Sequence, residues 1–143
     1  AGSAVVSLDV SRDGARLLLY LSTPLGPRLA VAGIIRDQKN VPTALGQLEY
    51  LPVASNAPID ATWVDARTVA TVSRGGEVAP VTLYEIGGPS ATFGQVPDAS
   101  TIVGGNGGAD GLRVLRTSGE VLRPQGSSWV TTGLSARVLA TKQ

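Results

Sequence analysis

The sequence predicts an all-β fold, on the basis of its apolar pattern and its turn residues. Apolar residues occur in short blocks of five to eight, separated by Gly, Pro, Asn, Asp and Ser. Because no window sustains the 3.6-residue period of an amphipathic helix, these blocks are interpreted as strands. The first two blocks are joined by a turn that contains Asp13 and Gly14, and an Asp-Gly pair between strand-like runs is a strong hairpin signal.

The expected strands fall into three successive groups. The first group holds residues 5–10, 16–21, 28–35 and 45–51. The second holds residues 59–64, 67–72, 81–86 and a shorter strand around Phe93. The third holds residues 101–103, 112–117, 120–123 and 129–132. In each group the first strand is followed by a turn with an aspartate, which precedes an aliphatic residue by four positions: Asp13, Asp65 and Asp110.

This repeat predicts a β-propeller rather than a β-sandwich. The three turn aspartates are 52 and 45 residues apart, and units of this size with four short strands are typical of propeller blades. A sandwich also has many short strands, but it does not require a repeat. Since closed propellers need about four to eight blades, we expect a partial propeller of about three four-stranded antiparallel blades. This single-domain fragment has its blades at roughly residues 4–53, 54–98 and 99–143.

The register of the three aspartate turns also predicts how the blades pack. Residues 5–10, 59–64 and 101–103 are expected to be equivalent innermost strands. The blades are expected to pack face to face through Leu17, Leu19, Val69, Val72 and Val114. Three blades leave two faces uncovered, and an exposed apolar face favours self-association, so a homodimer through the open blade faces is expected.

Composition excludes several classes of function. The chain has no Cys, His or Met, so it cannot form a Ser-His-Asp triad, a thiol nucleophile, or a zinc or haem site with nitrogen or sulfur ligands. With 12 basic and 11 acidic residues, it has no overall field that would attract nucleic acid or an anionic membrane. We therefore expect no cofactor, metal or nucleic acid partner, and we assign no catalytic residue.

Two carboxylate pairs and one glycine-rich segment are the features that most resemble chemical sites. Asp9 with Asp13, and Asp60 with Asp65, could pair as general acid and base, although solvated turns are the preferred interpretation. Residues 104–111 are rich in glycine but contain no Lys and do not fit phosphate-loop spacing. A calcium repeat would need stacked copies. The segment is interpreted as a flexible turn in which Gly permits positive φ.

Five basic residues near the C-terminus and the two tryptophans are the remaining candidates for a binding surface. A basic patch for an acidic partner or lipid headgroups is conceivable, but alternation along strands would scatter these side chains over two faces. The residues concerned are Arg113, Arg116, Arg123, Arg137 and Lys142. Trp63 and Trp129 lie in or next to strand runs and are interpreted as blade-packing residues.

Three stretches carry a resemblance to a known family. Residues 96–129 contain a Gly-Gly-Asn-Gly turn, the run RTSGEVLR and a tryptophan six residues later. Together with residues 6–17 (VSLDVSRDGARL) and 29–36 (LAVAGIIR), this region resembles the propeller domain of the actinobacterial LpqB lipoprotein family. The resemblance implies a cell-envelope lipoprotein, anchored to the outer face of the cytoplasmic membrane through a lipidated Cys far upstream of this fragment. The family has no agreed catalytic residues.

The resemblance also implies a partner. The family is associated with the MtrA-MtrB two-component system, so the chain is expected to be a non-catalytic interaction module that contacts the extracytoplasmic domain of a sensor histidine kinase and influences cell-wall homeostasis. Because loops carry recognition in such folds, the best-placed contacts are the turn at residues 104–111 and the polar connection at residues 36–43, through Arg36, Asp37, Gln38 and Lys39. The alternative is a carbohydrate-active or ligand-binding propeller whose site lies on blades absent from this chain.

Overall fold

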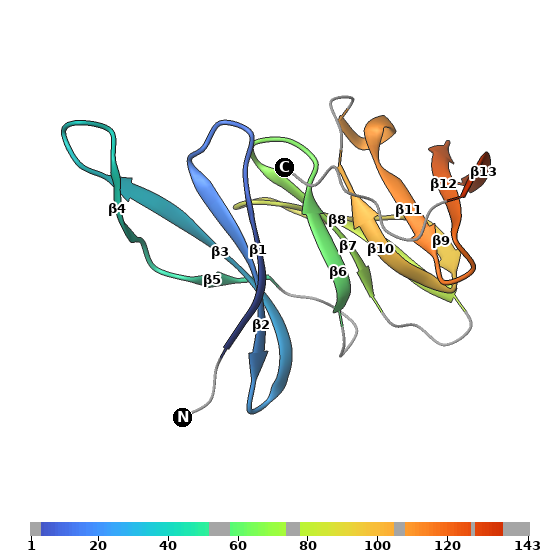
Figure 1. The fold of residues 1–143 in the computed structure, drawn as a ribbon, viewed down its shortest axis with the longest axis horizontal. Coiled ribbons are helices and arrows are strands. Elements are labelled where there is room, and N and C mark those ends of the chain that lie inside the picture. Colours follow the sequence, from blue (N-terminus) through green and yellow to red (C-terminus); the bar gives the residue numbers. More distant parts are fainter. Residues whose placement is uncertain (1–3, 52–57, 74–77, 105–107, 127, 136–143) are drawn as a thin grey trace.

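Three antiparallel sheets follow one another along the chain (Figure 1). The computed structural model describes residues 4–51, 58–73, 78–104, 108–126 and 128–135. Within these residues each sheet is built from consecutive strands, and the helical structure is a single 3₁₀ turn, η1 (Gly108–Gly111). The arrangement confirms an all-β partial propeller in which each sheet is a blade.

The first blade has five strands, and its fourth position is divided between two short ones. The strands are β1 (Ala4–Val10), β2 (Arg16–Thr23), β3 (Gly26–Arg36), β4 (Pro42–Leu45) and β5 (Glu49–Tyr50). The strand expected at residues 45–51 is therefore confirmed only in part: β5 lies within it, but β4 begins before it and the two are not continuous. One end of the long strand β3 pairs with β4 and its middle pairs with β5, and between them the Gly46 amide donates a hydrogen bond of 2.8 Å to the Gly33 carbonyl. The chain reverses earlier than expected, because the β3–β4 turn closes within residues 37–41.

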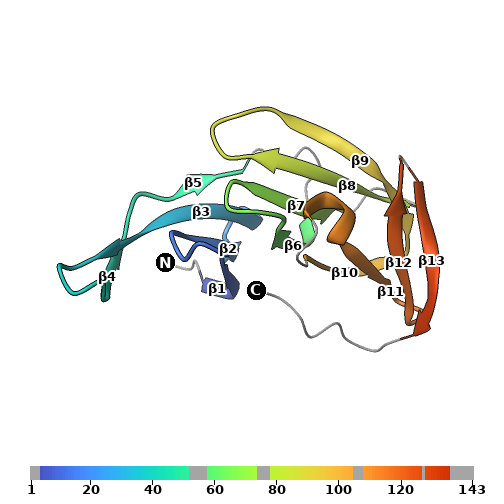
Figure 2. The ribbon, with the colours of Figure 1, turned by 90° about the horizontal axis from the view of Figure 1, so that it is seen from above.

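The second and third blades have four strands each. The second consists of β6 (Pro58–Trp63), β7 (Thr68–Ser73), β8 (Val78–Glu85) and β9 (Ser90–Pro97). The third consists of β10 (Ala99–Val103), β11 (Arg113–Arg116), β12 (Glu120–Gln125) and β13 (Ser128–Ser135). Strands β1, β6 and β10 each begin a blade and neighbour one another across the blade junctions, as Figure 2 shows for β6 and β10. They are the equivalent inner strands that the aspartate turns predict.

Apolar side chains fill the two junctions between the blades. At the first junction, residues of β2 and β3 pack against the second blade: Leu18, Leu29 and Val31 against Ala61, Trp63 and Val69. At the second junction, the second blade packs against the third: Ala70, Val72, Val81 and Val96 against Ile102, Val114 and Leu122. Burial of this apolar surface is what holds adjacent blades together.

Two of the residues expected at these junctions lie elsewhere. Leu18 faces the second blade, so Leu17 and Leu19, its neighbours in the strand, point to the opposite face. Leu19 instead packs with Leu21 and Ala30. Because strand side chains alternate with period two, an assignment that is off by one residue moves a side chain to the wrong face. Val69 at the first junction, and Val72 and Val114 at the second, are confirmed.

The outer face of the first blade exposes apolar side chains. Leu8 and Val10 flank Asp9, which faces the second blade, and they are 59% and 38% exposed. On the third blade, Val103 and Leu115 occupy the face away from the second blade and are buried. Within the described residues, large exposed apolar side chains of strands therefore lie mostly on the first blade, and Leu134 of β13 is an exception at 66% exposed. A homodimer through open blade faces stays a prediction.

Candidate functional site

The four residues predicted to contact a partner lie at the tip of the β3–β4 hairpin. Arg36 ends β3, and Asp37, Gln38 and Lys39 form the turn that leads to β4. The hairpin projects away from the second and third blades in both ribbon views (Figures 1 and 2). Its tip is therefore open to a partner on several sides.

Asp37 shapes the turn. Its Oδ1 accepts hydrogen bonds from the backbone amides of Lys39 at 2.8 Å and Val41 at 2.9 Å. The Asp37 amide donates to the Val41 carbonyl at 2.9 Å. Asn40 takes a left-handed φ of 65°, which Asn tolerates better than most residues. The Asp37 carboxylate is thus engaged within the turn and is not free for a partner.

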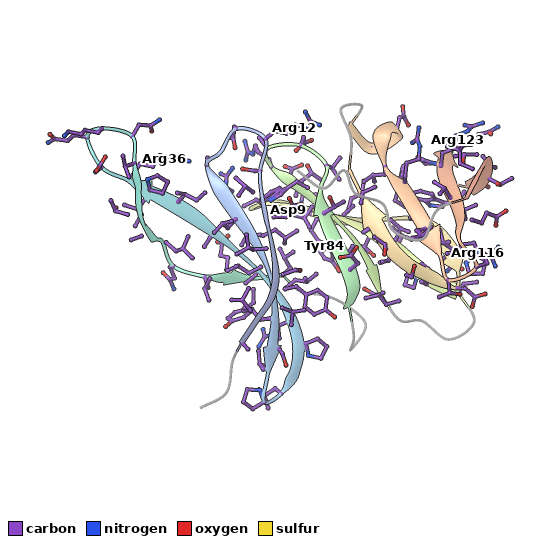
Figure 3. The ribbon with its side chains drawn as sticks, in the orientation of Figure 1. Asp9, Arg12, Arg36, Tyr84, Arg116 and Arg123 are labelled. Carbon is purple, nitrogen blue, oxygen red and sulfur yellow. The ribbon has the colours of Figure 1, made fainter. Side chains whose placement is uncertain are left out.

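Arg36 joins this hairpin to the neighbouring β1–β2 turn. Its guanidinium donates to the Asn40 carbonyl at 3.2 Å and to the Gly14 carbonyl at 2.7 Å. Figure 3 shows Arg36 at the base of the projecting turn. Arg36 therefore holds two loops together, and its role, like that of Asp37, is structural.

All residues of the turn are exposed, and among the four predicted contact residues the side chains of Gln38 and Lys39 are those with no hydrogen bond or ion pair within the described part of the chain. Large apolar side chains lie on both faces of the hairpin beside them. Ile35 pairs with Ala44 and Leu45 pairs with Ile34, so Ile35 and Leu45 point to opposite faces, 49% and 45% exposed. Val41, in the turn, is 49% exposed. We call Ile35, Gln38, Lys39, Val41 and Leu45 the hairpin surface. Exposed apolar residues grouped around polar ones are typical of protein contact sites.

The aspartates considered as acid and base residues each have structural partners. Asp9 is buried, and its Oδ2 lies 3.4 Å from the Trp63 amide and 3.5 Å from the Thr62 hydroxyl. Asp60 Oδ2 accepts a hydrogen bond of 2.9 Å from the Ile102 amide of the next blade. Both carboxylates therefore hold inner strands together.

Asp13 and Asp65 act within their own turns. Asp13 Oδ1 accepts hydrogen bonds from the Ser11 hydroxyl at 2.7 Å and the Ala15 amide at 3.1 Å. The Ser11 hydroxyl first, and the Ala15 amide second, hold the pKa of Asp13 below its usual value. Asp65 accepts from the Arg67 amide at 2.8 Å. These interactions agree with the turn interpretation of both residues.

The glycine-rich segment joins β10 to β11, as expected, but its first residue has an unexpected role. Gly108 has a positive φ of 62° and begins η1. Gly104 packs against the second blade, where a Cβ would clash with the Trp63 carbonyl oxygen. The Gly104 amide donates to the Thr62 hydroxyl at 3.1 Å. Residues 105–107 lie outside the described residues.

A comparison with models of known protein families identifies the family of the chain. The model described as the lipoprotein LpqB β-propeller domain matches residues 1–136, which include all three blades. The chain belongs to this family. Neither the curated proteins nor the solved structures include a match to it.

As a member of the LpqB propeller family, the chain is a domain of a lipoprotein. In the described residues, no helix is long and apolar enough to span a membrane. The same part of the chain contains no group of three or more Asp or Glu residues positioned to hold a metal ion.

The C-terminal arginines that the structure describes do not form a basic patch. Arg113 donates to the carbonyls of Asp110 and Leu112, at 3.0 and 2.7 Å. Arg116 pairs with Glu120 at 2.7 Å and with Asp98 at 3.4 Å. Three positions apart on β11, these two arginines lie on opposite faces. Arg123 is exposed, and Arg137 and Lys142 lie outside the described residues.

Both tryptophans pack between blades, as the sequence predicts. Trp63 is buried at the first junction and its Nε1 donates to the Asp9 carbonyl at 2.8 Å. Trp129 on β13 meets Phe93 on β9 edge to face, with ring centroids 5.9 Å apart. Its Nε1 donates to the Phe93 carbonyl at 2.8 Å. The roles of Asp60 and Gly104 at the second junction were missed, because no local sequence pattern marks a contact 42 residues away.

Proposed function

We propose that the chain is a non-catalytic interaction module of a cell-envelope lipoprotein that is anchored outside this chain to the outer face of the cytoplasmic membrane. Membership of the LpqB propeller family supports the lipoprotein context. The observation that carries the interaction role is the hairpin surface, in which Gln38 and Lys39 stand exposed between exposed apolar side chains on a braced hairpin. A preformed loop binds with a smaller loss of conformational entropy than a flexible one.

We further propose that the partner is the extracytoplasmic domain of the sensor histidine kinase of the MtrA-MtrB system, and that contact with it modulates signalling and cell-wall homeostasis. Lys39 supplies a positive charge at the tip, which would meet an acidic group of the kinase. Ile35 and Leu45 supply apolar area on the two faces of the hairpin, and Val41 supplies it in the turn. Such a contact combines a polar recognition residue with buried apolar area, as protein interfaces commonly do.

The test is binding of the chain to the purified extracytoplasmic domain of the kinase. Substitution of the two open turn residues, Gln38→Ala with Lys39→Glu, should weaken binding by about tenfold. Arg123→Glu is the matched control, because Arg123 is also an exposed cation but lies at the other end of the molecule (Figure 3). Equal affinity of the two variants would remove the hairpin from the interface, and absence of binding by the unaltered chain would overturn the proposed partner.

A further inference from the structure

A cleft lies between the first and second blades, away from the hairpin tip. Glu49, Tyr50 and Leu51 line one side, and the β8–β9 turn from Tyr84 to Ser90 lines the other. Figure 2 shows this turn and β5 facing each other along the edges of the two blades. The volume is about 300 Å³, which is at the lower end of the range for small-ligand sites. We call it the rim cleft.

The strand register directs two polar side chains into the rim cleft. Tyr84 pairs with Val69, whose side chain packs in the first junction, so Tyr84 also faces the first blade. Glu49 pairs with Val31, which packs in the same junction from the other side, so Glu49 faces the second blade. The floor is apolar and fixed, because Leu51 and Ile86 both pack against the junction core.

Tyr84 has an unused hydroxyl. The residue is only 4% exposed, yet its hydroxyl forms no hydrogen bond with any described residue. Thr71 Oγ1 is the one side-chain polar atom that is both fully enclosed and unpartnered in the described chain, so the Tyr84 oxygen still reaches the cleft. A buried tyrosine hydroxyl normally has a partner. The rim cleft therefore offers a hydrogen-bonding group to an occupant.

The charge in the rim cleft is negative and unpaired. Glu49 and Glu85 form no ion pair within the described residues. Two cations lie nearby without pairing to these carboxylates. Arg28 stacks over the ring of Tyr50, a lining residue of the cleft, at 4.1 Å. Glu85 follows Tyr84 on β8, so its side chain leaves the strand on the opposite face, and it borders both the rim cleft and an adjoining cavity that Arg67 lines.

Gly88 keeps the Glu85 carboxylate folded over the β8–β9 turn. A Cβ at Gly88 would lie 2.8 Å from Glu85 Oε1. The absence of a side chain at Gly88 thus leaves room for the Glu85 carboxylate at this position.

We propose that the rim cleft binds a guanidinium or alkylammonium group. Glu49 and Glu85 pair with the charge, the Tyr84 hydroxyl accepts a hydrogen bond, and the aliphatic stem lies over Leu51 and Ile86. Charge-assisted hydrogen bonds to carboxylates are the strongest available to such a group. The volume admits one long basic side chain or a small free amine. This site is separate from the hairpin surface and does not depend on the proposed kinase contact.

The test is a binding titration at low ionic strength, in which NMR chemical shifts of the chain are monitored. The ligands are agmatine, a free guanidinium compound, and a short capped peptide that carries a single arginine. A citrulline peptide is the neutral control. Glu49→Gln and Glu85→Gln should each weaken agmatine binding by about threefold, and Tyr84→Phe by a similar factor. Asp110→Asn removes an exposed carboxylate of the third blade and should change nothing.

Gly88→Ala provides a variant that keeps every charge. Its Cβ must displace the Glu85 carboxylate, which is the end of a flexible side chain, so the fold should persist while binding weakens. Tighter binding of the arginine peptide than of agmatine would identify a partner's side chain as the source, and the reverse would identify a free amine. Equal binding of the citrulline peptide, or equal binding by the Glu85→Gln and Asp110→Asn variants, would overturn the proposal.

Discussion

Trp63 donates two hydrogen bonds to Asp9 across the first blade junction. The indole Nε1 reaches the Asp9 carbonyl at 2.8 Å, and the Trp63 amide lies 3.4 Å from the Asp9 carboxylate. Both residues are buried, with Asp9 on the inner strand of the first blade and Trp63 on that of the second. The second blade repeats the arrangement toward the third, where Asp60 accepts from the Ile102 amide. The inner strands of the first and second blades thus each present an aspartate to the backbone of the next inner strand.

Removal of the Asp9 carboxylate should destabilise the chain. Asp9→Ala leaves the buried Trp63 amide and the Thr62 hydroxyl without this acceptor, and an unsatisfied buried polar group costs about 1–3 kcal/mol. Urea unfolding measures the loss. Asp110→Ala, at an exposed position, should stay within about 0.5 kcal/mol of the unaltered chain. Similar losses in the two variants would contradict a junction role for Asp9.

Gly104 should not tolerate a side chain. In Gly104→Ala the new Cβ would meet the Trp63 carbonyl oxygen, which belongs to rigid backbone, so the second junction must open at a cost of about 1–3 kcal/mol. Gly33→Ala is the matched control, because no atom lies within 4 Å of a Cβ there and its φ is not positive. Thermal unfolding should separate the two variants clearly, and a Gly104→Ala protein as stable as Gly33→Ala would contradict the close contact.

Two buried threonines should respond in opposite directions to loss of the hydroxyl. Thr71 Oγ1 has no hydrogen-bond partner, so Thr71→Val removes an unsatisfied group and should stabilise the chain by about 1 kcal/mol. The Thr62 hydroxyl accepts from the Gly104 amide, so Thr62→Val should destabilise it by about 1–3 kcal/mol. Chemical denaturation of both variants checks the pair. Changes of the same sign would show that the hydroxyl partners are not what distinguishes these sites.

Acid should destabilise the chain through Asp13 and Glu120. The Ser11 hydroxyl holds the pKa of Asp13 below its usual value, and the hydrogen bond from Arg116 does the same for the pKa of Glu120. Because folding lowers these pKa values, both carboxylates contribute stability above their unfolded values, and the contribution is lost as the pH falls through the folded values.

The double variant Asp13→Asn with Glu120→Gln should therefore lose stability less steeply between about pH 5 and pH 3. The melting temperature as a function of pH measures this slope. Asp110→Asn should keep the slope of the unaltered chain, since its carboxylate makes no hydrogen bond in the described residues. If the melting temperature of the double variant fell with pH as steeply as that of the unaltered chain, Asp13 and Glu120 would not be the source of the acid sensitivity.

Local residue patterns were enough to reveal the all-β class, the three blades and the inner strands. Asp13 and Asp65 are recognisable in the sequence because an aspartate that caps its own turn acts over two or three residues. The family is also recognisable, because turn and strand residues recur along nearly the whole chain.

The faces of the strands and the sites were decided only by the tertiary structure. Leu17, Leu18 and Leu19 are equally apolar, so alternation alone cannot say that Leu18 meets the second blade. The division of the fourth strand of the first blade depends on where β3 finds partners, and the rim cleft joins Glu49 to Tyr84 from different blades. Contacts between residues so distant in sequence form only when the blades pack, since the burial of apolar surface fixes which faces meet.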